Sequence, residues 1–213
     1  MKVQDFIDSR LAELATYKKQ FETGFYFLEE DELFFIPEGE KWSAIECIEH
    51  INNLSEVYLP QLTKVCQTEK ATQSDDLNIS WFQGKARGWM SPLSEPQAMK
   101  MPAPKKLKPR RIQNPELRLS AQKVMENFIA DLGQIEKLLR IIPRSQELRN
   151  TKIISAAPPI RVKTLTGLEM IVPHIGRHLE QAERILKGGR LAKANVEENS
   201  DIIFPAIEPK SEH

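Results

Sequence analysis

The fold is decided by the stretch from Ser43 to Val65, which reads SAIECIEHINNLSEVYLPQLTKV. Its apolar side chains recur every three or four residues, the spacing that places them on one face of an α-helix. Ser43 and Glu46 form the S-x-x-E pattern of a capping box, which predicts that the helix begins here. Pro60 predicts a kink in it. The apolar face consists of Cys47, Ile51, Leu54, Tyr58, Leu62 and Val65.

Two further segments have the same periodicity. One helix is predicted from Ile7 to Leu28, before the central stretch. Another is predicted after it, because Asn114 suits the N-cap and Pro115 suits the first helical position. Apolar residues then keep the helical period as far as Pro143, so this helix is expected to end there.

The fourth predicted helix repeats the signals of the central one. Thr166 and Glu169 form a second capping box at its start. Gly188 and Gly189 predict its end, since glycine is the residue most often found just beyond a helix C-terminus.

Four helices without a clear strand pattern predict an all-α four-helix bundle. Residues 1–190 are expected to form one domain, with a C-terminal tail over residues 191–213. The connection between the second and third helices, about residues 67–113, is long for a bundle, and such loops are usually functional or disordered. Its tryptophans favour an ordered loop that covers part of the bundle.

Composition limits the function classes. The 213 residues contain 30 basic and 30 acidic side chains, so the balanced charge does not call for nucleic acid or an anionic membrane. The basic segment from Lys100 to Arg111 is proline-rich and lacks aromatic residues for stacking on bases, which makes nucleic-acid binding a weak hypothesis. No apolar run is long enough for a signal peptide or a membrane span, and two cysteines form no disulfide framework. A cytoplasmic protein is expected.

Three histidines provide the chemical signal. His174 and His178 are spaced i, i+4, which brings their side chains to one face of the fourth helix, close enough to share a metal ion. His50 lies on the apolar face of the second helix, about 10 Å from its start, and the pair lies about 15 Å from the start of its own helix. The three share one level if these helices run parallel. The alternative is a cluster of hydrogen-bonded core histidines without a metal.

Two short motifs resemble those of the DinB-like (DinB/YfiT) superfamily of metalloenzymes. They are W-S-A-I-E-C-I-E-H-I, from Trp42 to Ile51, and H-I-G-R-H-L-E-Q, from His174 to Gln181. The resemblance covers about residues 3–187. It implies a four-helix bundle in which His50, His174 and His178 bind a divalent metal: zinc, nickel, iron or manganese, which the ligands do not distinguish.

The resemblance also implies an activity. Three imidazoles leave a coordination position open for water or substrate, as in catalytic sites. The expected function is a metal-dependent enzyme that acts on a small molecule, either a thiol S-transferase that uses a low-molecular-weight thiol or a hydrolase. The alternative is a non-catalytic binding or stress-response module that the metal stabilises. A homodimer is left open.

For the other candidate residues, the sequence is compatible with a structural role as well as a functional one. Glu46, one turn before His50, is a candidate general base, although its capping role explains it without catalysis and is the favoured interpretation. Cys47 is a candidate fourth ligand or a buried apolar residue. In the long connection, the candidates for binding a substrate or cofactor are Trp81, Lys85, Arg87 and Trp89.

Overall fold

A computed structural model describes residues 1–68, 72–99, 102–117 and 119–200. The helices are α1 (Val3–Phe25), α2 (Glu30–Phe34), α3 (Ala44–Thr68), α4 (Trp81–Met90), η1 (Lys105–Leu107), α5 (Arg110–Gln113), η2 (Pro115–Leu117), α6 (Ala121–Ile141), η3 (Ile142–Arg144), α7 (Gln146–Asn150) and α8 (Thr164–Ser200). Strands β1 (Lys152–Ile154) and β2 (Arg161–Lys163) form one antiparallel hairpin, in which Ile153 lies opposite Val162. The predicted all-α class is confirmed.

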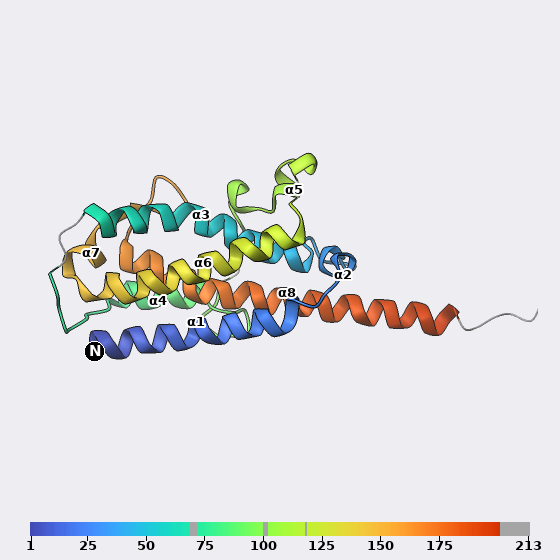
Figure 1. Cartoon of the computed structure of the whole chain (residues 1–213), viewed down its shortest axis with the longest axis horizontal. Helices are drawn as coiled ribbons and strands as arrows, with labels where there is room; N and C mark the ends of the chain where they lie inside the picture. Colours follow the sequence, from blue (N-terminus) through green and yellow to red (C-terminus); the bar gives the residue numbers. More distant parts are fainter. Residues whose placement is uncertain (69–71, 100–101, 118, 201–213) are drawn as a thin grey trace, which may run out of the picture.

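The long helices α1, α3, α6 and α8 enclose the main core. Helix α3 packs against α6 and α8, and α1 packs against the same two helices from the other side (Figure 1). Aromatic rings fill the middle: Phe21 stacks on Phe25 and contacts Phe128, and all three are fully buried. No helix in the described part of the chain is long and apolar enough to cross a membrane.

The direction of the helices corrects one expectation. Figure 1 shows that α3 and α8 run in opposite directions, so the parallel arrangement that the histidine spacing required is wrong. The histidines still meet, because α8 begins well inside the far end of α3 (Figure 1). Helix α7 and the β-hairpin connect α6 to α8 at that end.

Capping motifs in the sequence predicted the start of one long helix correctly and that of another wrongly. The capping box at the start of α3 is confirmed, since the main-chain N–H of Ser43 donates to Glu46 and that of Glu46 donates to the Ser43 hydroxyl. The predicted start at Asn114 and Pro115 is wrong, because these residues lead only into the short turn η2. Helix α6 begins later, at Ala121, and Ser120 is its N-cap.

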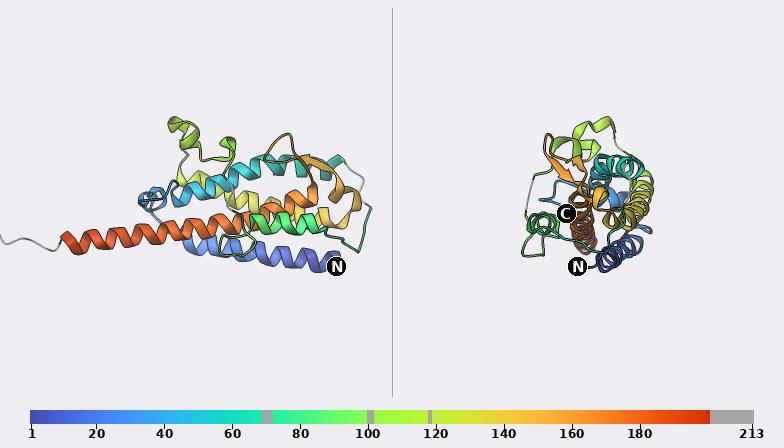
Figure 2. Two further views of the ribbon diagram at one scale, coloured as in Figure 1. Left: turned by 180° about the vertical axis from the view of Figure 1, so that it is seen from behind. Right: turned by 90° about the vertical axis from the view of Figure 1, so that its left-hand side faces the viewer.

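Both predicted ends of the fourth helix are also wrong. Helix α8 begins at Thr164, ahead of the expected cap, and the Glu169 carboxylate binds Arg10 instead of closing a capping box. The helix continues through Gly188 and Gly189 to Ser200, past the other helices (Figure 2). The last part of the expected tail, residues 201–213, lies outside the described residues.

The long connection is not a plain loop. It contains α4, the turn η1 and the short helix α5. Helix α4 packs along α8 on the side away from α3 and α6 (Figure 2). Its start is capped by Ser80, whose hydroxyl accepts from the main-chain N–H of Gln83. Part of the predicted loop is therefore a helix packed on the bundle.

Candidate metal centre

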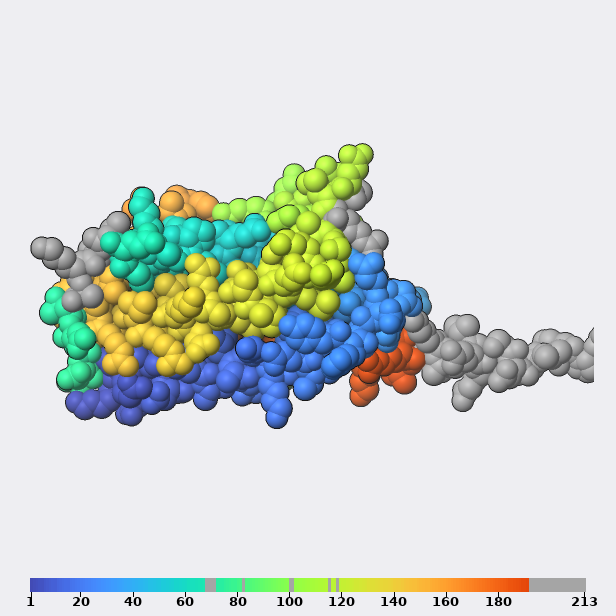
Figure 3. Space-filling model, in the orientation of Figure 1, coloured from blue at the N-terminus to red at the C-terminus, as the bar shows by residue number. Residues whose placement is uncertain are grey.

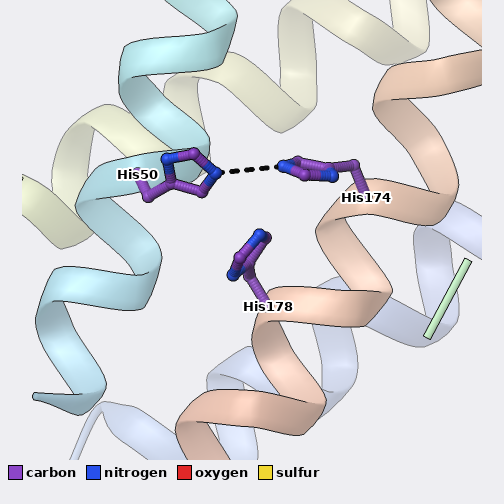
Figure 4. A group of neighbouring side chains, drawn as sticks. All are labelled: His50, His174 and His178. Carbon is purple, nitrogen blue, oxygen red and sulfur yellow. Dashed lines mark hydrogen bonds between the residues drawn. The ribbon is translucent and has the colours of Figure 1, made fainter. Parts of the chain in front are cut away.

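The three histidines meet between α3 and α8. His50 extends from α3, and His174 and His178 extend from adjacent turns of α8 (Figure 4). One ring nitrogen from each lies within 4.8 Å of the corresponding nitrogens of the other two. All three side chains are buried, with exposed fractions of 3%, 9% and 7%. This cluster could hold a metal ion.

Hydrogen bonds fix the protons of two of these rings. Nδ1 of His50 lies 2.6 Å from the Leu107 carbonyl oxygen, and Nδ1 of His178 lies 3.0 Å from the Gln181 amide oxygen. Both oxygens only accept, so both Nδ1 atoms carry the hydrogen. In the neutral rings, the two Nε2 atoms are then unprotonated and have lone pairs available for a metal.

The spacing of the ring nitrogens fits one shared ion. Nε2 of His50 lies 3.1 Å from Nε2 of His174 (Figure 4). Two imidazole nitrogens bound to one zinc ion at about 2.0–2.1 Å in tetrahedral geometry lie roughly 3.3 Å apart. Nδ1 of His174 is buried, and among the described residues it has no hydrogen-bond partner. The residues present therefore fit a three-nitrogen site.

Burial keeps the three rings neutral. It lowers the pKa of His50, although the hydrogen bond to Leu107 partly opposes this. The pKa values of His174 and His178 lie well below their ordinary value, mainly because of burial and secondarily because the neighbouring histidines repel a second positive charge. Neutral imidazole is the form that binds metals.

The segment that supplies the Leu107 carbonyl is held onto α3. The Asn53 amide donates to the carbonyl oxygens of Leu107 and Lys108, at 3.4 and 3.0 Å. The main-chain N–H of Arg110 donates to Glu49 at 3.3 Å. These contacts keep the carbonyl in place against the His50 ring, which in turn fixes the ring's orientation.

Glu46 also helps to hold this segment onto α3. Its carboxylate accepts from Arg111 at 2.5 and 3.0 Å and from the Ser43 main chain at 2.9 Å. Both carboxylate oxygens are therefore engaged by the Arg111 guanidinium and by the start of α3. The arrangement therefore favours its structural role over that of a general base, and it uses Arg111 of the basic segment.

Cys47 is fully buried in the core. Burial raises the pKa of its thiol far above the ordinary value. The described ligand cluster consists of the three histidines alone. These surroundings favour the interpretation of Cys47 as an apolar core residue over that of a fourth ligand.

Trp42 and Gly176 shape the surroundings of the cluster. The Trp42 ring lies 5.0 Å from the His50 ring and 6.0 Å from the His178 ring, centre to centre. Gly176 stands between the two α8 histidines, where a Cβ atom would collide with the Tyr17 ring of α1. The glycine in the motif therefore allows α1 to approach α8 at the level of the site.

Arg177 connects α8 to the segment that follows α4. Its guanidinium donates to the carbonyl oxygens of Ser91 at 2.7 Å and Met99 at 2.9 Å, and to that of Trp89. The side chain is buried, with 7% exposed. It thus holds a turn of main chain against the helix that carries two of the histidines.

The candidate substrate-binding residues of the long connection do not join the cluster. Arg87 pairs with Glu13 at 2.6 Å and lies 3.7 Å from Glu169, between α4, α1 and α8. Lys85 lies 4.3 Å above the Trp81 ring, on the exposed side of α4. The Trp89 side chain is partly buried, and the main-chain carbonyl oxygen of this residue accepts from Arg177. Arg87 and Lys85 thus have their described partners outside the histidine cluster.

The chain belongs to the DinB superfamily. The sequence profile described by that name matches residues 25–182, which include all three histidines. The match covers most of the chain and agrees with the resemblance inferred from the two motifs. No curated protein and no solved structure matches the sequence, so the superfamily is as far as the comparisons reach.

Proposed function

We propose that His50, His174 and His178 bind one divalent metal ion, and that the protein is a metal-dependent enzyme acting on a small molecule. The observation that carries the proposal is the convergence of ring nitrogens from two helices, with Nδ1 of His50 and His178 occupied by oxygens that only accept. Spacing alone would not orient the lone pairs.

Thiol transfer and hydrolysis are the two reactions considered. A divalent metal with three imidazole ligands supplies an open position that activates a bound water or a thiolate. The protein's own part is to keep the rings neutral and oriented, through the Leu107 carbonyl and the Gln181 amide. Trp42 gives the site an aromatic wall, which suits a partly apolar substrate.

Elemental analysis tests the ligands. We expect one equivalent of metal in the untagged protein and a near-complete loss in His50→Ala and His174→Ala. His213→Ala removes the remaining histidine and serves as the matched control, which should keep its metal. Stoichiometric metal in both ligand variants would refute the site.

A non-catalytic module stabilised by metal is the second candidate. It is favoured by the burial of the histidines and by the position of the two described grooves, neither of which a histidine lines. Cobalt substitution separates the candidates. A visible spectrum that changes when a thiol is added supports the enzyme, whereas an unresponsive spectrum supports the module.

A further inference from the structure

A polar groove lies on the opposite side of α3 from the histidines, where α3 meets α6. Its volume is about 440 Å³, and its lining comes from these two helices alone. Figure 3 looks onto the face where they meet, with α3 in teal and cyan above α6 in yellow. The residues that matter below are Ser55, Glu56, Leu59, Pro60, Asp131 and Gln134.

Ser55 presents an unused hydroxyl to this groove. Only 1% of the residue is exposed, and its Oγ has no partner with hydrogen-bond geometry among the described residues. It nevertheless lies near enough to Asp131 to lower the pKa of that carboxyl. Leaving such a group unpaired costs about 1–3 kcal/mol, so a ligand that donates a hydrogen bond to it would relieve this cost.

Pro60 adds a second acceptor. Proline has no main-chain N–H, so the Glu56 carbonyl one turn earlier loses the donor that it would have in a regular helix. Both residues line the groove. The Glu56 carbonyl in this turn of α3 therefore lacks its regular helical donor, and Leu59 and Pro60 add apolar side chains to the lining of the groove.

Asp131 supplies the charge. Burial raises its pKa to about 6, with a further increase from Glu56 and a decrease from Ser55. At neutral pH the carboxylate is largely ionised, although it is partly withdrawn from water. Glu56 and Lys64 are the other charged side chains in the lining, and Glu56 is paired with Arg110 at 2.9 Å.

We propose that this groove is a binding site for a primary aliphatic ammonium group. Such a group has three N–H donors, which match the Asp131 carboxylate, the Ser55 hydroxyl and the Glu56 carbonyl. Its carbon chain packs on Leu59 and Pro60. The Gln134 amide uses its N–H to reach Thr63 at 3.0 Å, so its oxygen is directed to accept from a second polar end of the ligand.

Calorimetric titration of the full chain with 1,4-diaminobutane at pH 8 tests the site. We expect saturable binding of one equivalent, weakened by about 10-fold or more in Asp131→Asn and several-fold in Ser55→Ala, because a hydrogen bond to a charged group is worth more than a neutral one. Glu136→Gln is the matched control on α6, since Glu136 is exposed and pairs with Arg140 outside the groove.

Two further titrations decide between this site and simple charge attraction. The bis-quaternary analogue 1,4-bis(trimethylammonio)butane has the same two charges and carbon chain as 1,4-diaminobutane but no N–H donor, so it should bind at least about 10-fold more weakly. Equal binding of the two ions, or undiminished binding to Asp131→Asn, would overturn the proposal. Binding should survive in His50→Ala, and its loss there would instead place the amine at the histidines and likewise overturn it.

The pH dependence gives an independent check. The amine stays protonated throughout the range below about pH 9. Protonation of Asp131 removes the negative charge as the pH falls through about 6, so affinity should drop between pH 7 and pH 5. Affinity that is constant over this range would contradict a role for Asp131.

Discussion

The side of α3 that meets α8 and the side that meets α6 both bury polar side chains, but they differ in how completely the polar atoms are paired. Toward α8, Nδ1 of His50 and the Asn53 amide both use the Leu107 carbonyl. Toward α6, the Asn52 amide donates to Val124, but its own oxygen and the Ser55 hydroxyl have no partner among the described residues.

The α8 side is therefore a preorganised site, whereas the α6 side has polar atoms whose hydrogen bonds are incomplete. On the α8 side, hydrogen bonds to Leu107 and Gln181 already orient the rings of His50 and His178, and the ring nitrogens of the three histidines lie close together. On the α6 side two buried polar atoms have no partner among the described residues, and one of them belongs to Ser55, which lines the proposed ammonium site. His174 Nδ1 is the exception on the first side, since it too is unpaired within the described part of the chain.

The largest effect is expected where pairing on the α8 side is most complete. Arg177→Met removes a charged donor from three main-chain carbonyl oxygens, of which that of Trp89 also accepts from the Met99 main chain, and we expect the free energy of unfolding to fall by about 3 kcal/mol. Urea denaturation measures it. Arg140→Met, which breaks an exposed pair with Glu136, should cost less than about 0.5 kcal/mol. Equal losses of unfolding free energy in the two variants would contradict the expected difference between the buried Arg177 and the exposed Arg140.

A smaller effect is expected from the support of His178. Gln181→Leu removes the acceptor for Nδ1, so the ring is no longer held in the metal-binding orientation. We expect the metal affinity to fall by about 10-fold, as for other groups that orient metal-binding histidines. Competition with a chelator measures it. Gln122→Leu, an exposed amide on α6, is the control, and an unchanged affinity in Gln181→Leu would show that the amide does not orient the ring.

On the α6 side, Asp131 should make stability depend on pH. Its pKa is about 6 in the folded chain, against an ordinary value of 3.8. The folded state therefore binds the proton more tightly, and stability contributed by this group is lost as the pH rises from about 4 through 6. Asp131→Asn removes this loss, so its unfolding free energy relative to the parent should increase over that range. A constant difference would contradict the raised pKa.

The smallest effect is expected for Ser55→Ala. The hydroxyl makes no hydrogen bond with good geometry, so its removal loses no paired interaction and relieves an unpaired one. Unfolding by urea should change by less than about 0.5 kcal/mol in either direction. A loss above about 1 kcal/mol would mean that Ser55 and Asp131 form a bond that stabilises the interface, and that the groove is closed.

Local signals in the sequence predicted elements better than boundaries. The capping box at Ser43 is correct because all of its partners lie within one turn. Asn114 and Pro115 satisfied the same kind of rule, but only a short turn follows them. The glycine pair at 188 and 189 did not end α8, because Pro37 and Phe35 pack against these glycines and the helix continues.

The sequence predicted the cluster of three histidines and missed the residues that support it. The spacing of His174 and His178, with His50 on another apolar face, was sufficient to bring the three together as candidates. The Leu107 carbonyl could not be found in this way, because a main-chain oxygen is the same at every residue. The paired Arg111 and Glu46 were visible only as separate basic and acidic residues.

The sequence by itself determined the helical class, the superfamily and the three histidines, since each depends on residue types at short, fixed spacings. Tertiary structure decided that α3 and α8 run in opposite directions and that the basic segment holds a carbonyl against His50. It also decided that, within the described part of the chain, polar atoms on the other side of α3 have no partner. These features depend on where distant main chain lies, and that position is set by packing across the whole core.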